Sequence, residues 1–401
     1  MIFNTYWFVC AVIPYLVLYL AIPVARLRFY LLILFCLVFH FHFAGPAGVI
    51  PILVMASVTY LCALSNNRVL IRLAIFFCVA ALCFYKYSLF VSEEIVSQFF
   101  RVQGRELASM ASSALPARPP LAISFFTFEF VHYLYEVLKG GRPIEAPLKF
   151  VSFAIFFPSL VAGPIKRYQQ FLPSLEEALG RTDWRLVASG VFLVAVGFFK
   201  KLVVADNLTL FTEAYSNKFV ELSLAGRWFF LLALSYRIYM DFSGYSDIAI
   251  GLARIMGVSL PANFNWPYCA ENIRDFWQRW HISLSSWIRD YIYIPLGGSR
   301  SGQLRTLFNA AVAFALCGLW HGPHWHFVLW GLYHGFGFAV CATYRKAPFG
   351  LGELFYRFLT MFPLLKVLIT FLFVSFGWLL FFCDPQDAFF KCSLLFWGRS
   401  L

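Results

Sequence analysis

Two histidines in apolar surroundings are the residues of this sequence best suited to chemistry. His281 lies in RWHISLS (279–285), and His321 lies in GLWHG (318–322), directly after Trp320. Imidazole changes its protonation near neutral pH, so either ring is suited to general acid–base catalysis. The Gly-Pro pair beside His321 is interpreted as placing it at the start of a helix. Taken alone, each histidine is equally consistent with a hydrogen-bonded core residue.

Other catalytic patterns are absent from the sequence. Three further histidines, His324, His326 and His334, lie downstream, but without an HExxH motif or a nearby carboxylate at ligand spacing they predict no metal site. The ten cysteines form no CxxC pair, so neither zinc nor a disulfide framework is indicated. The string GYS (244–246) lacks the closing glycine of a nucleophile elbow. No Walker A or dinucleotide-binding glycine pattern occurs, and no histidine is followed five residues later by aspartate.

Charged residues inside apolar segments are a second candidate for function. Arg237 and Asp241 are four positions apart, which places them on one face of a helix, and Asp247 follows. A charge at bilayer depth is costly unless it is paired, so such residues indicate either a functional site or a structural ion pair between helices. Buried charges also line ion and proton paths, which makes a transporter or channel one alternative. The inverted repeats typical of transporters are not evident.

These residues are carried by a chain that is too apolar to fold as a soluble globule. Of its 401 residues, 61% are hydrophobic and 13% are charged, whereas about a quarter of an ordinary soluble domain is charged. The sequence therefore predicts one all-α membrane domain. The net charge of +12 is interpreted as cytoplasmic loops and contacts with anionic lipid headgroups, and no nucleic-acid partner is expected.

Apolar segments near the length of a spanning helix, about 20 residues, predict about eleven transmembrane helices. Several are short or interrupted by Gly, Pro or charge, so some should be re-entrant. The long block 241–304 mixes charges with tryptophans and tyrosines, which predicts amphipathic or half-inserted helices at the membrane interface. The predicted spans are 6–25, 29–45, 47–64, 71–91, 119–138, 148–164, 187–205, 226–240, 305–320, 325–343 and 358–382.

Basic residues in the first loops predict the orientation. Arg26 and Arg28 follow the first span, residues 45–48 after the second carry no charge, and Arg68 with Arg72 follows the third. Because positive loops stay in the cytoplasm, the N-terminus is expected outside it. No basic residue precedes the first apolar run, so this run is expected to be a retained span and not a cleaved signal peptide.

Three segments stand out together in the second half of the chain: MDFSGYSDIAIGLARIMG (240–257), PANFNWPYCAENIRDFWQRWHISLSSWIRDYIYIPLGGSR (261–300) and GLWHG (318–322). By these segments the chain resembles the membrane-bound O-acyltransferase (MBOAT) family, particularly its alginate O-acetylation branch. Two earlier segments fit as well, ISFFTFEFVHYLYEVLKG (123–140) and FFPSLVAGPIKRYQQF (156–171). Together these segments cover the chain from about residue 120 to residue 383 in the family's order.

The resemblance implies an α-helical ring of spans around a thinned centre, in a bacterial plasma (inner) membrane. It implies a catalytic core over 119–383, preceded by N-terminal spans (1–118) and followed by a C-terminal tail (384–401). The implied reaction moves an acetyl group from a cytoplasmic donor, acetyl-CoA, toward hydroxyls of an extracytoplasmic polysaccharide. A periplasmic SGNH-type acyltransferase usually completes delivery, and no permanently bound cofactor is implied.

By the same resemblance, His321 matches the family's essential histidine and His281 its second signature histidine. An imidazole can take a hydroxyl proton as the oxygen attacks a thioester carbonyl, typically contributing about 10²–10⁴-fold, so His321 is predicted to be the catalytic base. The developing oxyanion needs a donor, which His281 or the indole N–H of Trp320 can supply. Asp241 or Asp247 is a candidate to hold a histidine in the required tautomer.

Four arginines of the central block are candidates for donor binding. Coenzyme A is polyanionic, so these arginines are predicted to contact its phosphates at a cytoplasmic mouth, with headgroup binding as the alternative for each. A second enzyme interpretation keeps the fold and transfers D-alanyl groups from a carrier protein to a cell-wall polymer. The four arginines are Arg254, Arg274, Arg279 and Arg289.

Overall fold

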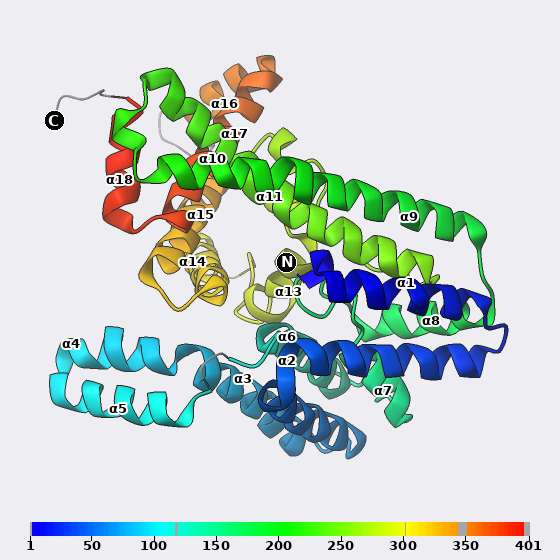
Figure 1. The fold of residues 1–401 in the computed structure, drawn as a ribbon. Coiled ribbons are helices and arrows are strands. Elements are labelled where there is room, and N and C mark those ends of the chain that lie inside the picture. Colours follow the sequence, from blue (N-terminus) through cyan, green and yellow to red (C-terminus); the bar gives the residue numbers. More distant parts are fainter. Residues whose placement is uncertain (1, 117–118, 301, 344–350, 397–401) are drawn as a thin grey trace. The chain divides into compact units, whose positions relative to one another are not determined.

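The computed structural model describes residues 2–116, 119–300, 302–343 and 351–396, which fold into helices joined by irregular segments (Figure 1). No strand occurs in these ranges, so the predicted all-α class is confirmed. Large apolar side chains project outward, including Phe76, which is 72% exposed, and Phe192, which is 70% exposed. Such a surface is disfavoured in water and accommodated by lipid.

Four helical segments of the described ranges are long and apolar enough to cross a bilayer. Together with the exposed apolar side chains, they identify a multi-pass membrane protein. The number of about eleven spans and the ring around a thinned centre stay predictions. The four segments are Ala25–Leu64, Arg68–Phe99, Trp184–Ser216 and Pro363–Phe382.

The helices form two compact units. The first comprises Met1–Val196 and Tyr245–Pro261, and the second comprises Gly197–Gly244 and Ala262–Leu401. These bounds follow contacts between residues and do not test the predicted division into 1–118, 119–383 and 384–401, which stays a prediction. Two helices, α9 and α11, cross from one unit to the other.

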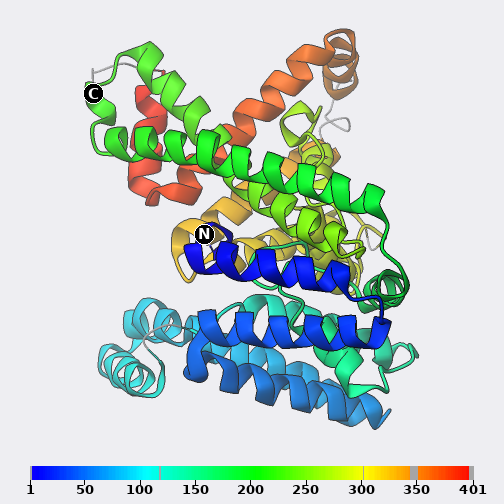
Figure 2. The ribbon, with the colours of Figure 1, turned by 45° about the vertical axis from the view of Figure 1, so that its right-hand side comes forward.

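The first unit contains the helices of the N-terminal half. The predicted break between 29–45 and 47–64 is confirmed, because α2 is interrupted at Gly45 (φ 66°), directly before Pro46. The helical run through α3 and α4 turns back so that α4 and α5 lie side by side (Figure 2). The helices are α1 (Tyr6–Ala21), α2 (Ala25–Leu64), α3 (Arg68–Phe90), α4 (Ser97–Phe99), α5 (Arg101–Ala114), α6 (Ile123–Leu138), α7 (Pro147–Ala154), α8 (Tyr168–Gly180) and α9 (Trp184–Phe198).

The predicted span 148–164 is wrong. Helix α7 ends at Ala154, and the chain continues through turns to Arg167, the residue before α8. Pro158 and Pro164 lack the backbone N–H that a continuous helix requires, which explains the break. The irregular segment is tolerated because it is covered by protein: the side chains of Phe156 and Phe157 are fully buried.

The second unit contains residues 262–304 of the central block and the C-terminal helices. Its helical segments include two π-helical stretches, Phe199–Ala205 and Arg289–Tyr293. The predicted span 358–382 is divided at Phe362, because α17 begins at Pro363. The helices are α10 (Asp206–Ser216), α11 (Leu224–Ile255), α12 (Ile273–Arg279), α13 (Ile282–Ile288), α14 (Gln303–His321), α15 (Trp325–Thr343), α16 (Leu351–Met361), α17 (Pro363–Phe382) and α18 (Pro385–Leu394).

The block 241–304 does not begin with a helix of its own, and its predicted place at the membrane interface stays a prediction. Residues 241–255 continue α11, which is a single helix of 32 residues. The short helices α12 and α13 lie in the rest of the block, separated by Trp280 and His281. Apolar residues between the charges explain the continuation: Ile248, Ala249 and Ala253 are fully buried.

Helices α14 and α15 form the tightest helix pair of the second unit. A Cβ atom on Gly318 would lie 2.0 Å from the carbonyl oxygen of Phe327, and one on Gly331 would lie 2.2 Å from the carbonyl oxygen of Phe314. Only glycine permits this approach of one backbone to the other. Because α14 ends at His321, the glycines fix the position of that histidine against α15.

Candidate active site

His281 lies at the junction of α12 and α13 in a left-handed backbone conformation (φ 44°, ψ 53°). A non-glycine residue with positive φ is uncommon and is typical of functional sites. Two backbone hydrogen bonds hold the junction against residues 263–265: the Ile282 N–H donates to the Asn263 carbonyl at 2.9 Å, and the Asn265 N–H donates to the Arg279 carbonyl at 2.9 Å. The position of the histidine is therefore set by its backbone.

The ring of His281 is buried, with 1% of the residue exposed. Its Nδ1 lies 3.3 Å from Oδ1 of Asn263, and the ring stands edge-on to Phe242 with centroids 4.6 Å apart. Its Nε2 is buried and has no hydrogen-bond partner in the described part of the chain. Burial lowers the pKa of His281 to about 3, so the ring is neutral at physiological pH.

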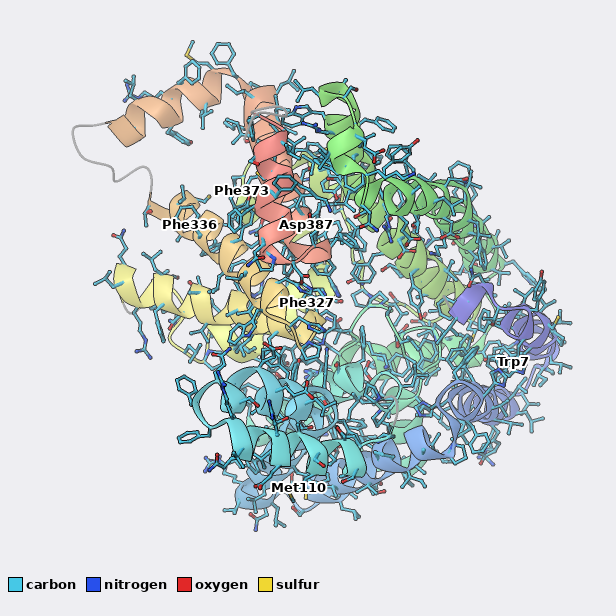
Figure 3. The ribbon with its side chains drawn as sticks, turned by 60° about the vertical axis from the view of Figure 1, so that its left-hand side comes forward. Trp7, Met110, Phe327, Phe336, Phe373 and Asp387 are labelled. Carbon is cyan, nitrogen blue, oxygen red and sulfur yellow. The ribbon has the colours of Figure 1, made fainter. Side chains whose placement is uncertain are left out.

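His321 is the last residue of α14, so the interpretation that it opens a helix is wrong. The chain leaves the helix in an extended conformation at Gly322. Rings of α15 and α17 pack against His321, with centroids 5.1 Å away at Trp330, 5.0 Å at Phe381 and 6.3 Å at Phe327. Figure 3 labels Phe327 near the start of α15. Unlike His281, His321 is partly exposed.

Trp320 joins the two histidines. Its ring centroid lies 4.7 Å from that of His321 and 5.9 Å from that of His281, and both contacts are edge-to-face. Residues 40 positions apart in the sequence therefore belong to one cluster. We call His281, Trp320 and His321 the histidine cluster. Their catalytic roles stay predictions.

The other downstream histidines pack against neighbouring aromatic or imidazole rings. His334 is fully buried, and its ring packs edge-on against Trp277 at 5.2 Å and against Trp330 at 4.9 Å. The rings of His324 and His326 stack on each other at 5.4 Å. Across the described residues, no group of three or more His, Cys, Asp or Glu side chains has the arrangement of a metal site.

Asp241 and Arg237 contact different partners. Asp241 Oδ1 lies 2.6 Å from Nζ of Lys201, which also contacts Asp206 at 2.7 Å. Arg237 contacts Glu213 at 3.2 Å. The structure therefore favours the interpretation of structural ion pairs, here between α11 and the preceding helix. Asp241 pairs with Lys201, whereas Nδ1 of the buried His281 faces Asn263.

Asn263 is the residue of this site that sequence reasoning missed. It lies in a non-helical stretch 18 positions before His281, where neither periodicity nor motif spacing indicates a contact. The only signal was its place inside the segment 261–300. Asp247, the second candidate to orient a histidine, belongs to the first unit.

The four predicted arginines are distributed unequally. Arg274 and Arg289 line a cavity of about 350 Å³ in the second unit, whereas Arg279 forms an ion pair with Asp275 at 2.7 Å and Arg254 belongs to the first unit. The guanidinium of Arg274 also lies 5.4 Å from the ring of Phe338. Both cavity arginines are exposed, and Arg289 pairs with Asp290 at 2.8 Å, so Arg274 is better suited to bind an anion at the cavity.

The cavity has an apolar body and few polar groups. Trp277, Phe314 and Cys317 contribute apolar surface, while Ser285 and Ser286 contribute hydroxyls. Cys317 is one helical turn before His321, so the wall of the cavity and the histidine cluster share α14. The remaining lining residues are Gln278, Ile282, Ile288, Tyr293, Ala310, Ala313 and Phe338.

A family model described as MBOAT, membrane-bound O-acyltransferase family, matches residues 144–350. The chain belongs to the MBOAT family. The matched residues include the whole histidine cluster and the cavity, and the match confirms the resemblance predicted from the motifs at 240–257, 261–300 and 318–322. The family consists of polytopic membrane proteins, in agreement with the apolar helices of this member.

Three relatives of this MBOAT protein carry names that describe an activity. A peptidoglycan O-acetyltransferase of Helicobacter pylori is 38% identical over 288 residues, which is 65% of this chain and 54% of the relative. A Pseudomonas aeruginosa protein named as an alginate O-acetylase, AlgI, is 38% identical over 65% of this chain and 48% of the relative. A teichoic acid D-alanyltransferase of Bacillus subtilis is 31% identical over 67% of this chain and 72% of the relative. The chain spans about half the length of the first two relatives.

Proposed function

We propose that this MBOAT protein is a membrane O-acyltransferase that transfers acetyl groups from a cytoplasmic donor toward hydroxyls of an extracytoplasmic polysaccharide. The observation that carries the proposal is the histidine cluster, in which a partly exposed imidazole ends a helix beside a buried one. The names of the relatives from Helicobacter pylori and Pseudomonas aeruginosa support acetyl as the group that is transferred.

In the proposed step, His321 acts as the general base. Its neutral ring takes the proton of the acceptor hydroxyl while the hydroxyl oxygen attacks the thioester carbon. The tetrahedral intermediate then collapses, the carbon–sulfur bond breaks, and the imidazolium returns the proton to the leaving thiolate. The partial exposure of His321 supports this role, because a base must touch the group that it deprotonates. The buried His281 does not touch the substrate in this proposal and acts through its neighbours in the histidine cluster.

The cavity beside α12 and α14 is the proposed subsite for the donor, acetyl-CoA. Arg274 and Arg289 would contact the phosphates of coenzyme A, and the apolar body would hold the arm that carries the acetyl group. Arg279 is less suited, because it does not line the cavity and its guanidinium pairs with Asp275. Coenzyme A is a substrate in this proposal and not a resident cofactor.

The proposed location is the plasma (inner) membrane of a bacterium, with the N-terminus outside the cytoplasm and a periplasmic SGNH-type acyltransferase as partner. Arg26, Arg68 and Arg72 support the orientation. Arg28 adds less, because its side chain is buried and donates hydrogen bonds to Leu20, Thr182 and Ile22. Membrane lipid is the surrounding solvent.

D-alanyl transfer from a carrier protein is the second candidate. The observation that favours it is coverage, since the chain spans 72% of the Bacillus subtilis teichoic acid D-alanyltransferase but about half of the O-acetylating relatives. The histidine cluster suits either acyl group, because the attack of a hydroxyl on a thioester is the same reaction. The donor distinguishes the two candidates.

A comparison of donors tests the proposed function. Purified protein in proteoliposomes is supplied on its cytoplasmic face with radiolabelled acetyl-CoA or with a carrier protein charged with D-alanine, and thioester consumption is followed. We expect consumption of acetyl-CoA. In Arg274→Ala, KM for acetyl-CoA should rise about tenfold with little change in kcat, because a charge-assisted contact contributes about 1.5–3 kcal/mol. Arg300→Ala, an exposed arginine that does not line the cavity, is the matched control. Use of the carrier protein alone would contradict acetyl transfer and favour the second candidate.

A further inference from the structure

One amide oxygen organises the buried side of the histidine cluster. Oδ1 of Asn263 lies 2.6 Å from the Ser283 hydroxyl, 3.3 Å from the Ser283 backbone nitrogen and 3.3 Å from Nδ1 of His281. The three residues are buried, with at most 5% exposed. Buried polar atoms of this kind are expected to satisfy one another's hydrogen-bonding capacity.

The contacts determine which end of the Asn263 amide faces the histidine. A backbone N–H can only donate, so the amide atom that Ser283 N–H approaches is the oxygen and not the nitrogen. An amide oxygen can only accept, so the Nδ1 that faces it carries a proton. In a neutral imidazole with a proton on Nδ1, the other nitrogen, Nε2, holds an unshared electron pair.

We propose that Asn263 is a positioning residue that holds His281 in the tautomer with a proton on Nδ1, so that Nε2 serves as a buried hydrogen-bond acceptor. Nε2 is buried and has no partner in the described part of the chain, which leaves this lone pair available to the cluster. The catalytic consequence rests on the proposed function, whereas the tautomer itself does not.

The assignment changes the role expected for His281. A ring whose Nε2 accepts cannot donate from that atom to an oxyanion, so the predicted donor role passes to the indole N–H of Trp320, which can only donate. His281 Nε2 can instead accept a hydrogen bond, although no partner contacts it in the described part of the chain. The ring is held edge-on by Phe242 and Trp320, neither of which carries a titratable group.

The backbone at this junction does not depend on the side chain of Asn263. The Ile282 N–H bonds to the carbonyl of Asn263, and the Asn265 N–H bonds to that of Arg279, so substitution of the amide leaves both bonds in place. Asn263→Leu removes the acceptor at similar volume, and Asn263→Asp keeps an acceptor oxygen. Asn309→Leu is the matched control, because Asn309 is also a fully buried amide of the second unit, bonded to the Gly298 carbonyl at 3.1 Å.

The test is the ¹⁵N spectrum of ring-labelled histidine in the full-length protein, with the His281 signals assigned by their loss in His281→Gln. We expect a protonated Nδ1 and an unprotonated Nε2 in the wild type and in Asn309→Leu, and loss of this pattern in Asn263→Leu. Asn263→Asp should keep the proton on Nδ1. If Asn263→Leu does not fold, the wild-type and Asp spectra still decide the tautomer.

Acetyl transfer by the same variants tests the catalytic consequence. Loss of the partner that orients a functional histidine typically lowers activity about 10–100-fold, so kcat of Asn263→Leu should fall by that factor and that of Asn263→Asp by less. A wild-type spectrum with the proton on Nε2 would overturn the tautomer, and full activity of Asn263→Leu would overturn the positioning role. A wild type that transfers no acetyl group would refute the proposed function and leave the spectrum to decide the tautomer.

Discussion

Burial separates the two signature histidines at the scale of single residues. His321 is partly exposed at the end of a helix, as the proposed base must be, whereas His281 is 1% exposed and contacts Asn263. The sequence pointed to both residues, because histidine is rare in apolar segments and both lie in motifs. Only the resemblance ranked them, since burial depends on the rings packed around each one, and those rings come from α11, α14, α15 and α17.

The low pKa of His281 has a measurable effect on stability. Above about pH 6.5, the ordinary pKa of histidine, neither the folded nor the unfolded chain protonates this residue. Below it the unfolded chain binds a proton, whereas the folded chain does so only near pH 3. As the pH falls through this window, this residue alone should therefore lower the free energy of unfolding by about 1.4 kcal/mol per pH unit.

Denaturant unfolding at several pH values between 6.5 and 3 measures this effect, since the window is bounded by the ordinary pKa and the lowered pKa. In His281→Gln the free energy of unfolding should depend less steeply on pH, because one proton fewer is taken up on unfolding. His324→Gln, which changes an exposed histidine, should match the wild type. Equal slopes in His281→Gln and the wild type would contradict the burial of a neutral ring.

At the scale of elements, the α14–α15 pair was the best predicted part of the site. The helices expected at 305–320 and 325–343 match Gln303–His321 and Trp325–Thr343 in their bounds, although neither is among the four described segments that are apolar enough to cross a bilayer. The prediction failed at 148–164, where prolines end α7, and it did not foresee that α11 continues through 241–255. Charge and apolar content are averages over a segment. They do not show where a helix breaks or which residues pack over it.

Close packing of this pair predicts a strong position dependence for added methyl groups. Gly331→Ala places a Cβ 2.2 Å from the Phe314 carbonyl, so the helices must separate, and we expect a loss of about 1–3 kcal/mol in stability together with reduced transfer. The matched control is Gly335→Ala on the same helix, where the nearest atom to the new Cβ lies 3.4 Å away.

Thermal unfolding in detergent compares the two variants. Gly335→Ala should be neutral or slightly stabilising, because alanine is favoured over glycine in a helix by about 1 kcal/mol. Equal midpoints for Gly331→Ala and the wild type would show that the two backbones do not approach as closely as described.

At the scale of the whole molecule, composition predicted a membrane protein but not the arrangement of its helices. An aromatic, weakly charged chain must place apolar side chains against lipid, and the outward-facing Phe76 and Phe192 agree. Contacts between segments distant in the sequence could not be foreseen in the same way. In the first unit, for example, Lys166 and Glu129 form a buried ion pair at 2.6 Å that no local pattern indicates.

The proposed orientation predicts where the N-terminus is found. An epitope tag fused before residue 1 should be accessible to antibody in intact spheroplasts, because Arg26 follows the first span and favours the cytoplasm for that loop. A tag in the loop at Arg68 should be accessible only after the membrane is opened. Detection of the N-terminal tag only in opened vesicles would reverse the assignment.

The measurement that tests the central claim most directly is acetyl transfer by His321→Ala in proteoliposomes supplied with acetyl-CoA. The account predicts a loss of kcat of at least about 100-fold, because a general base contributes about 10²–10⁴-fold, with an unchanged unfolding midpoint. The matched control, His324→Ala, changes an exposed histidine three positions away and should retain full activity. Wild-type rates in a folded His321→Ala protein would contradict the account.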